Sequence, residues 1–195
     1  MVIAFEKYLG LPMGGGKNKV NMFKDLRERI AKQINGWKEK FISKAGKEVL
    51  IKTAAQAIPT YLMSLLLLPK VLCSDINSIM AKYWWGQTSN ERKIYWINWK
   101  QLCDPKKAGG MGFRDIHAFN FAMLAKQAWR LLNHQNSLFF RVYKARYFPN
   151  VSFLEAELGS NPSYIWRSLL KAREIILAGA RWKVGCGTSI NIMGH

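Results

Sequence analysis

The chain has 195 residues, of which 49% are hydrophobic and 22% charged, enough for one large domain or two small ones. This balance excludes an intrinsically disordered tail and is typical of a protein that buries a core. Thirty Lys and Arg residues stand against twelve Asp and Glu, which gives a formal net charge of +18. A field of this sign attracts polyanions, so nucleic acid is favoured over an anionic membrane surface or a merely soluble basic surface.

Cysteine use and the absence of an obvious leader bear on the compartment. The three cysteines form no C-x-x-C pair: Cys73, Cys103 and Cys186. This pattern favours a reducing compartment, and a zinc site drawn from Cys103, His117 and His134 matches no usual ligand spacing. The most apolar stretch, residues 61–68, is far shorter than the roughly twenty residues that cross a bilayer. We expect an intracellular protein, nuclear or cytoplasmic, with no membrane partner.

The first part of the chain indicates a turn and then a helix. Residues 8–12 resemble the end of a short strand, and the glycines at 14–16 extend the turn into a loop. Gly16-Lys17 does not complete a phosphate-binding loop, because Asn18 occupies the Ser/Thr position. From Asn21 onward, apolar residues at steps of three and four predict a helix that ends near Gly36: Phe23, Leu26, Ile30, Ile34 and Trp37.

Three further helical segments follow before residue 87. One is predicted over residues 46–58, with Lys47 and Lys52 facing outward and five residues facing the core: Val49, Leu50, Thr53, Ala54 and Ala57. Pro59 ends it, because proline lacks the amide donor. A short buried helix is expected over residues 60–68, closed by Pro69. The last begins at Val71 and leads into Trp84-Trp85-Gly86 at helical spacing, through Ile76, Ile79, Met80 and Tyr83.

The second half of the chain is also mostly helical. Polar residues 87–93 indicate a loop and a boundary near residue 90, and residues 94–99 predict a short strand because they are aromatic and β-branched. A glycine turn at 109–112 then leads into a long helix over 116–132. Two more helices are expected at 137–147 and from Ser163, and two short strands at 181–195. The fold class is therefore mainly α, with a few short strands at the start, middle and C-terminal end.

Catalytic motifs are missing from the sequence. It holds no G-x-S-x-G, no H-E-x-x-H and no acidic cluster for two metal ions. Asp104 and Asp115 flank the glycine turn as turn formers and ion-pair partners. We expect no enzyme activity from this chain on its own and no cofactor.

Basic residues are concentrated near the start of the chain. Eleven Lys and Arg lie between residues 17 and 52, opposed by four acidic residues. Cations along successive helices can follow a phosphate backbone, although some of them belong to solvated faces or i,i+4 pairs. The candidate nucleic-acid contacts, with three from the later glycine turn, are Lys17, Lys19, Lys24, Arg27, Lys32, Lys38, Lys40, Lys44, Lys47, Lys52, Lys106, Lys107 and Arg114.

Six of the eight tryptophans fall into two groups. Four lie at core-like helical spacing and favour packing: Trp84, Trp85, Trp129 and Trp166. Trp37 and Trp99 stand beside basic residues, which leaves both packing and stacking on unpaired bases open for them.

In their order, several segments resemble non-LTR retrotransposon reverse transcriptases of the LINE type, called ribonuclease H-like proteins in plants. The segments are Tyr8-Leu-Gly-Leu-Pro12, Ile34-Asn-Gly-Trp37, Leu50-Ile-Lys52, Ile58 to Ser64, Leu68-Pro69, Tyr83-Trp-Trp-Gly86, Trp99 to Arg114, Phe119-Asn120 to Trp129-Arg130 and Trp182 to Ile192. The resemblance implies a residual palm edge at residues 1–20, a thumb-like helical domain at 21–90 and a truncated post-thumb connection at 91–195.

The same resemblance defines what the chain lacks. Members copy RNA into DNA with divalent metal ions held by palm aspartates, but no Tyr-x-Asp-Asp-like motif precedes Tyr8 here. Cys186 stands where an acidic residue is usual, and Met193 where tryptophan is usual. The resemblance implies a non-catalytic fragment that grips template and primer. Its partners would be RNA, RNA–DNA or DNA duplex backbone and the missing palm and C-terminal domains.

Other functions remain open. The chain could be a helical protein-interaction module that uses residues 61–68 and the Trp84-Trp85 pair, or a non-functional transposon remnant. A fragment without its palm would expose apolar surface, so self-association is a further expectation. An active polymerase is the third alternative, which primer extension by this chain alone would reveal.

Overall fold

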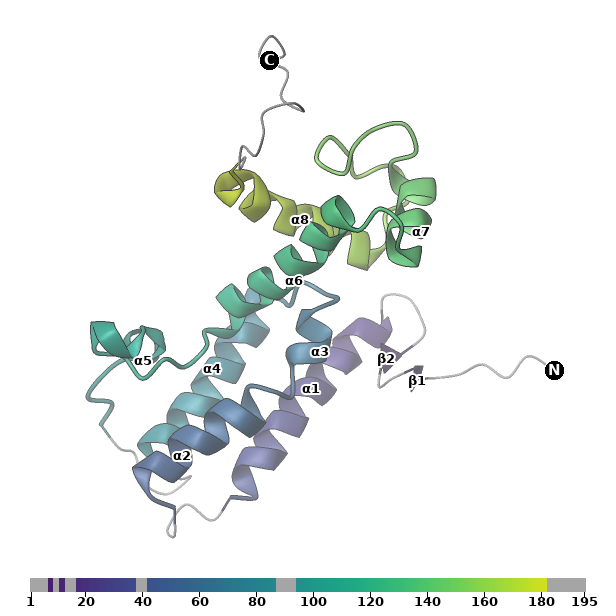
Figure 1. Cartoon of the computed structure of the whole chain (residues 1–195). Helices are drawn as coiled ribbons and strands as arrows, with labels where there is room; N and C mark the ends of the chain where they lie inside the picture. Colours follow the sequence, from purple (N-terminus) through teal and green to yellow (C-terminus); the bar gives the residue numbers. More distant parts are fainter. Residues whose placement is uncertain (1–6, 9–10, 13–16, 38–41, 87–93, 182–195) are drawn as a thin grey trace, which may run out of the picture. The chain divides into compact units, whose positions relative to one another are not determined.

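The computed structural model describes residues 7–8, 11–12, 17–37, 42–86 and 94–181, with side chains from residue 21 onward, and it is mainly helical (Figure 1). Its elements are β1 (Lys7–Tyr8), β2 (Leu11–Pro12), α1 (Lys17–Asn35), α2 (Lys44–Leu50), the π-helical turn η2 (Ile51–Ala55), α3 (Thr60–Met63), α4 (Lys70–Trp85), α5 (Trp99–Cys103), the 3₁₀ turn η3 (Lys106–Ala108), α6 (Ile116–Asn133), α7 (Leu138–Tyr147) and α8 (Tyr164–Gly179). The chain divides into two compact units, residues 1–124 and 125–195. No helix among the described residues is both long and apolar enough to span a bilayer.

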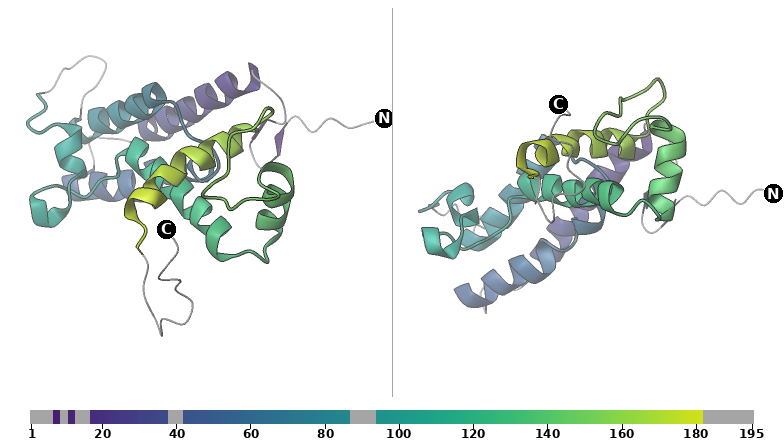
Figure 2. Two further views of the ribbon diagram at one scale, coloured as in Figure 1. Left: turned by 90° about the horizontal axis from the view of Figure 1, so that it is seen from above. Right: turned by 45° about the horizontal axis from the view of Figure 1, so that its top comes forward.

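Helix α1 follows the predicted apolar stripe. It begins four residues before the expected cap at Asn21, and it ends where Gly36 was expected to end it. Leu26, Ile30 and Ile34 are buried, as the spacing of three and four residues predicts. The stripe packs against α4, which lies beside α1 in Figures 1 and 2.

The core of the first unit includes residues on both sides of positions 87–93. Ile51, Ile76 and Met80 are fully buried between α1, η2 and α4. Leu102 and Phe113 join the same cluster. Residues on both sides of position 90 therefore share one core, and the three-part division into palm edge, thumb and connection stays a prediction about the family.

The predicted core face of the second helix is wrong. Val49 is 58% exposed and Thr53 is also exposed, whereas Lys47, Ile51 and Ala55 are buried. The cause is a segment that is apolar around most of its circumference, so that periodicity does not fix which side faces inward. A π turn follows at Ile51–Ala55, and lysine can bury its stem when its ammonium group reaches an acceptor.

The strand predicted in the middle of the chain is not formed. Residues 94–98 form no strand, and α5 begins at Trp99 because the Asn98 side chain caps it, accepting a hydrogen bond from the amide of Gln101 at 2.8 Å. At the start, β1 and β2 pair two residues each in antiparallel orientation, so the described part of this sheet is very short. The strands expected at the C-terminal end lie outside the described residues.

Asn120 of α6 holds the turn after α3 in place. Its amide group donates to the carbonyls of Met63 at 2.8 Å and Leu66 at 2.9 Å, and its oxygen accepts from the amide of Leu68 at 2.8 Å. The side chain is completely buried. The Phe119-Asn120 pair singled out in the sequence therefore serves folding, because buried backbone groups need partners.

The second unit packs around Trp166. Its ring is completely buried and stacks on Tyr147 at 4.6 Å and on Phe148 at 5.6 Å between centroids. Packing is thus confirmed for Trp166, but Trp129 is 48% exposed, contrary to expectation. The spacing in 137–147 predicts Leu138, Phe139, Val142 and Tyr143 on the inward side of α7. Phe139 and Tyr143 do pack against the core, but Leu138 and Val142 are exposed, because the aromatic residues of this helix form its packed face.

Candidate nucleic-acid interface

The solvent side of α1 carries four exposed cations: Lys24, Arg27, Arg29 and Lys32. Lys24 lies 3.9 Å from Glu28, and Arg27 lies 3.5 Å from Asp75 of α4. Both ion pairs are about half exposed or more, and such pairs contribute little to stability. Within the described residues, Arg29 and Lys32 form no ion pair, so their charge is open to an external anion.

Arg29 and Lys32 border an open depression of about 410 Å³, which is also lined by Gln33, Trp37 and Ile58. Trp37 is half-buried, and its ring packs on Tyr83 of α4 with centroids 5.0 Å apart. Packing fixes the indole, and the same side chain forms a wall of the depression. Two cations without an ion pair therefore lie next to an aromatic ring that packing holds in place, an arrangement that suits contacts with a sugar–phosphate backbone.

Lys44 and Lys47 bind to backbone carbonyls of the protein itself. Their ammonium groups donate to the carbonyls of Trp84 at 2.8 Å and of Tyr83 at 3.1 Å, at the C-terminal end of α4. The last carbonyls of a helix lack partners within it and carry partial negative charge, so cations stabilise that end. The prediction that Lys47 faces outward is wrong, since its residue is only 7% exposed. A buried ammonium group is unavailable to a phosphate.

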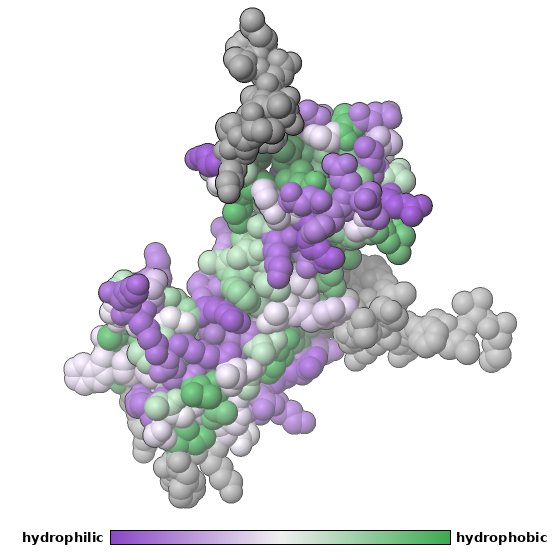
Figure 3. Space-filling view, in the orientation of Figure 1, coloured by the Kyte–Doolittle hydropathy of each residue, from purple (hydrophilic) through white to green (hydrophobic). Residues whose placement is uncertain are grey.

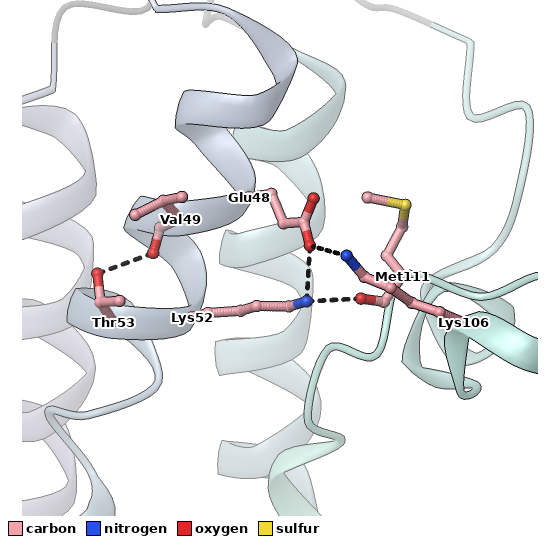
Figure 4. Close-up of polar contacts among 6 residues, drawn as sticks. All are labelled: Glu48, Val49, Lys52, Thr53, Lys106 and Met111. Atoms are coloured by element: carbon pink, nitrogen blue, oxygen red, sulfur yellow. Dashed lines mark hydrogen bonds and ion pairs between the residues drawn. The ribbon is translucent and has the colours of Figure 1, made fainter.

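Glu48 ties the glycine turn to α2 (Figure 4). Its carboxylate accepts from Lys52 at 2.7 Å and from Lys106 at 3.1 Å, and Lys52 also donates to the carbonyl of Met111 at 2.7 Å. The hydrogen bonds from Lys52 and then Lys106 hold the pKa of Glu48 below its ordinary value. These two lysines are therefore engaged with the protein itself.

The turn is close-packed at Gly110, and Gly109 has a left-handed backbone in open space. A Cβ atom on Gly110 would lie 2.0 Å from the carbonyl oxygen of Asp104, and Gly109 has φ of +85°. Lys107 is exposed on this turn, and Arg114 lies over the ring of Phe119 at 4.5 Å. No described residue forms an ion pair with Lys107.

The predicted contacts therefore separate by environment. Lys32, Lys107 and Arg114 are exposed without an ion pair among the described residues, and Lys24 and Arg27 are exposed within half-exposed ion pairs. Lys44 and Lys106 are exposed but bond to the protein, and Lys47 and Lys52 bond to it from buried and half-buried positions. The side chains of Lys17 and Lys19 are not described, and Lys38 and Lys40 lie outside the described residues. Arg29 was not among the predicted contacts. Its position three residues before Lys32 on the same helix could have indicated it.

The cysteines and the apolar segment at residues 61–68 were also considered in the sequence. The described residues contain no group of three His, Cys, Asp or Glu side chains close enough to hold a metal ion. Burial, with the charge of Asp115, raises the pKa of Cys73 to about 11 and that of Cys103 to about 12. Most of the alternative docking surface at residues 61–68 and Trp84-Trp85 is not exposed. Met63, Leu66, Leu68 and Trp84 are buried and Trp85 is half-buried, whereas Tyr61 is 44% exposed.

Relatives from Arabidopsis thaliana place this basic helical chain in a family. It is 42% identical over 132 residues to "Uncharacterized mitochondrial protein AtMg00310", an alignment that covers 67% of this chain and 86% of the relative. The chain belongs to the family of that protein. It is also 32% identical over 173 residues to "Putative ribonuclease H protein At1g65750", covering 86% of this chain but only 28% of that relative's length. No established protein-family profile matches the chain.

Proposed function

We propose that this chain is a non-catalytic piece of a LINE-type, ribonuclease H-like retrotransposon polymerase, and that helix α1 grips the backbone of a template–primer duplex. The relative named as a putative ribonuclease H protein supports the origin, and the sequence lacks the palm aspartates. No catalytic step is assigned to the chain. For location, the proposal adds the mitochondrion, named for the other relative, to the nucleus and cytoplasm.

One observation carries the binding role. Arg29 and Lys32 are exposed on one side of α1, have no ion pair among the described residues, and flank the depression at Trp37. The opposite side of the helix is anchored in the core through Ile30 and Ile34, so the cations are held on a rigid element. Contacts of this kind recognise the phosphate backbone without reading sequence.

The test is fluorescence anisotropy with a labelled RNA–DNA hybrid at several salt concentrations. We expect the purified chain to bind, with affinity falling steeply as salt rises and with little sequence preference. The double variant Arg29→Ala/Lys32→Ala should bind more weakly. A matched control, Arg141→Ala/Arg167→Ala, removes two exposed cations from the second unit. Undetectable binding, salt-independent binding, or equal losses in the two double variants would refute the proposal.

A further inference from the structure

Residues 94–97, which precede α5, expose large apolar side chains. Ile94 is 71% exposed and Trp96 79%, and Tyr95 and Ile97 are 45% and 43% exposed. Single exposed apolar residues are common, but four in succession with two aromatic rings form a contiguous patch, which usually marks an interaction site. The chain thus presents a ready-made aromatic surface that its own core does not use.

This patch borders a groove of about 820 Å³ between α4 and α5, inside the first unit. Its apolar wall contains Trp85, Tyr95 and Trp99, and the rings of Trp85 and Tyr95 lie 6.2 Å apart. Trp99 is fixed by stacking on Phe113 at 5.0 Å. In Figure 3, the region of α5 shows pale residues of intermediate hydropathy next to hydrophilic ones. The groove is therefore neither purely apolar nor purely polar.

Polar groups complete the lining. Lys82 of α4 and Lys100 of α5 are exposed at the groove, and neither forms an ion pair among the described residues. Asp104 and Asn77 also line it. The second carboxylate at the groove belongs to Asp115, which accepts hydrogen bonds from the Asn77 side chain at 2.9 Å and from the amide of Ala118 at 2.8 Å. The two ammonium groups remain open to an external anion.

The combination of aromatic rings, ammonium groups and a carboxylate indicates which kind of ligand fits the groove. An apolar peptide would take Lys82 and Lys100 out of water without giving them partners, which is costly. A nucleic-acid strand instead offers phosphates to the lysines and flat bases to the rings, and its exocyclic amines can donate to Asp104. A duplex keeps its bases stacked inside, so the strand must be unpaired where it meets the rings.

We propose that the groove between α4 and α5 binds an unpaired segment of nucleic acid. One base stacks on Tyr95, which lines the groove, a further base stacks on the exposed ring of Trp96, the next residue outside the lining, and Lys82 and Lys100 contact the phosphates. This site is separate from the cations of α1 and does not depend on them. It would add a preference for single strands, or for the single-stranded ends of a duplex, to the backbone grip of α1.

The test uses the full chain and labelled single strands, a 12-nucleotide oligodeoxycytidine, whose bases carry exocyclic amines, and its RNA counterpart. Trp96→Ala and Tyr95→Ala should each lower the affinity about 5- to 100-fold, the usual effect of losing one base–aromatic stack. Trp129→Ala is the matched control, since it removes a tryptophan that is 48% exposed in the other unit. Lys82→Ala/Lys100→Ala should flatten the salt dependence for single strands.

Two results would overturn this site. One is unchanged single-strand affinity in both aromatic variants. The other is a change in oligomeric state of Trp96→Ala by light scattering without a change in single-strand affinity, which would make the patch a protein-docking surface. A blunt RNA–DNA hybrid separates this test from that of α1. Arg29→Ala/Lys32→Ala should weaken binding of the hybrid, and Trp96→Ala should not.

Discussion

Lys47→Met separates the structural role of a lysine from a binding role. The variant keeps the length and apolar stem of the side chain but removes the ammonium group that donates to the Tyr83 carbonyl at 3.1 Å and lies 4.9 Å from the Tyr83 ring. A hydrogen bond to a charged group contributes about 1.5 to 3 kcal/mol, and methionine cannot donate to the carbonyl, which keeps its hydrogen bond from the amide of Gly86 at 3.0 Å. We expect a loss of that size.

The assay is thermal and denaturant unfolding followed by circular dichroism. For a unit of this size the loss corresponds to a decrease of about 6 to 12 °C in the midpoint of thermal unfolding. Lys32→Met is the matched control: it changes an exposed lysine of α1, so its free energy of unfolding should change by less than about 0.5 kcal/mol.

Nucleic-acid binding should respond in the opposite way. At a temperature where both variants are folded, Lys47→Met should bind the RNA–DNA hybrid like the wild type, and Lys32→Met should bind it more weakly. The reasoning is refuted if Lys47→Met unfolds like the wild type, or if it is folded and loses as much affinity as Lys32→Met.

Three further substitutions test the folding of the first unit. Asn120→Ala removes three buried hydrogen bonds and should cost about 3 to 5 kcal/mol in denaturant unfolding, and a loss under 1 kcal/mol would contradict the geometry. Gly110→Ala should cost more than about 3 kcal/mol because its Cβ meets the Asp104 backbone, whereas Gly109→Ala, which has open space but positive φ, should cost about 1 kcal/mol. The lowered pKa of Glu48 means that its contribution to stability is present above the ordinary value of 4.5 and is lost as pH falls through the depressed value. Glu48→Gln should therefore be less stable at pH 7 and lose less stability than the wild type on acidification, and parallel curves would contradict this.

Helix positions were predictable wherever caps and periodicity agreed. The end of α1 at Gly36, the left-handed Gly86 after α4 and the Ser163 cap of α8 all follow from local chemistry that the sequence displays. The inward face of α2 was not predictable, because the burial of Lys47 depends on the carbonyl of Tyr83, which only the tertiary fold brings near. The strand expected at 94–99 was wrong for a similar reason. Its residues are aromatic and β-branched like those of a strand, but they pair with no strand among the described residues.

The residues of the candidate site were also only partly predictable from the sequence. Composition and clustering pointed to the basic helices, and α1 does present its cations to solvent. Sequence alone could not separate Lys32 from Lys52, since both read as outward-facing, and the pairing of Lys52 with Glu48 and Met111 arises from the folded turn. The exposure of Tyr95 and Trp96 was not predicted, because the aromatic and β-branched residues around them indicated a strand.

The salt dependence of hybrid binding tests the backbone grip of α1 most directly. Log affinity is measured against log salt concentration for the wild type, Arg29→Ala/Lys32→Ala and the control Arg141→Ala/Arg167→Ala. Each lost phosphate contact should lower the steepness of this line by about 1, so the α1 variant should be flatter than the wild type by about 2 and the control should be unchanged. Equal slopes in all three proteins would show that α1 does not hold the backbone.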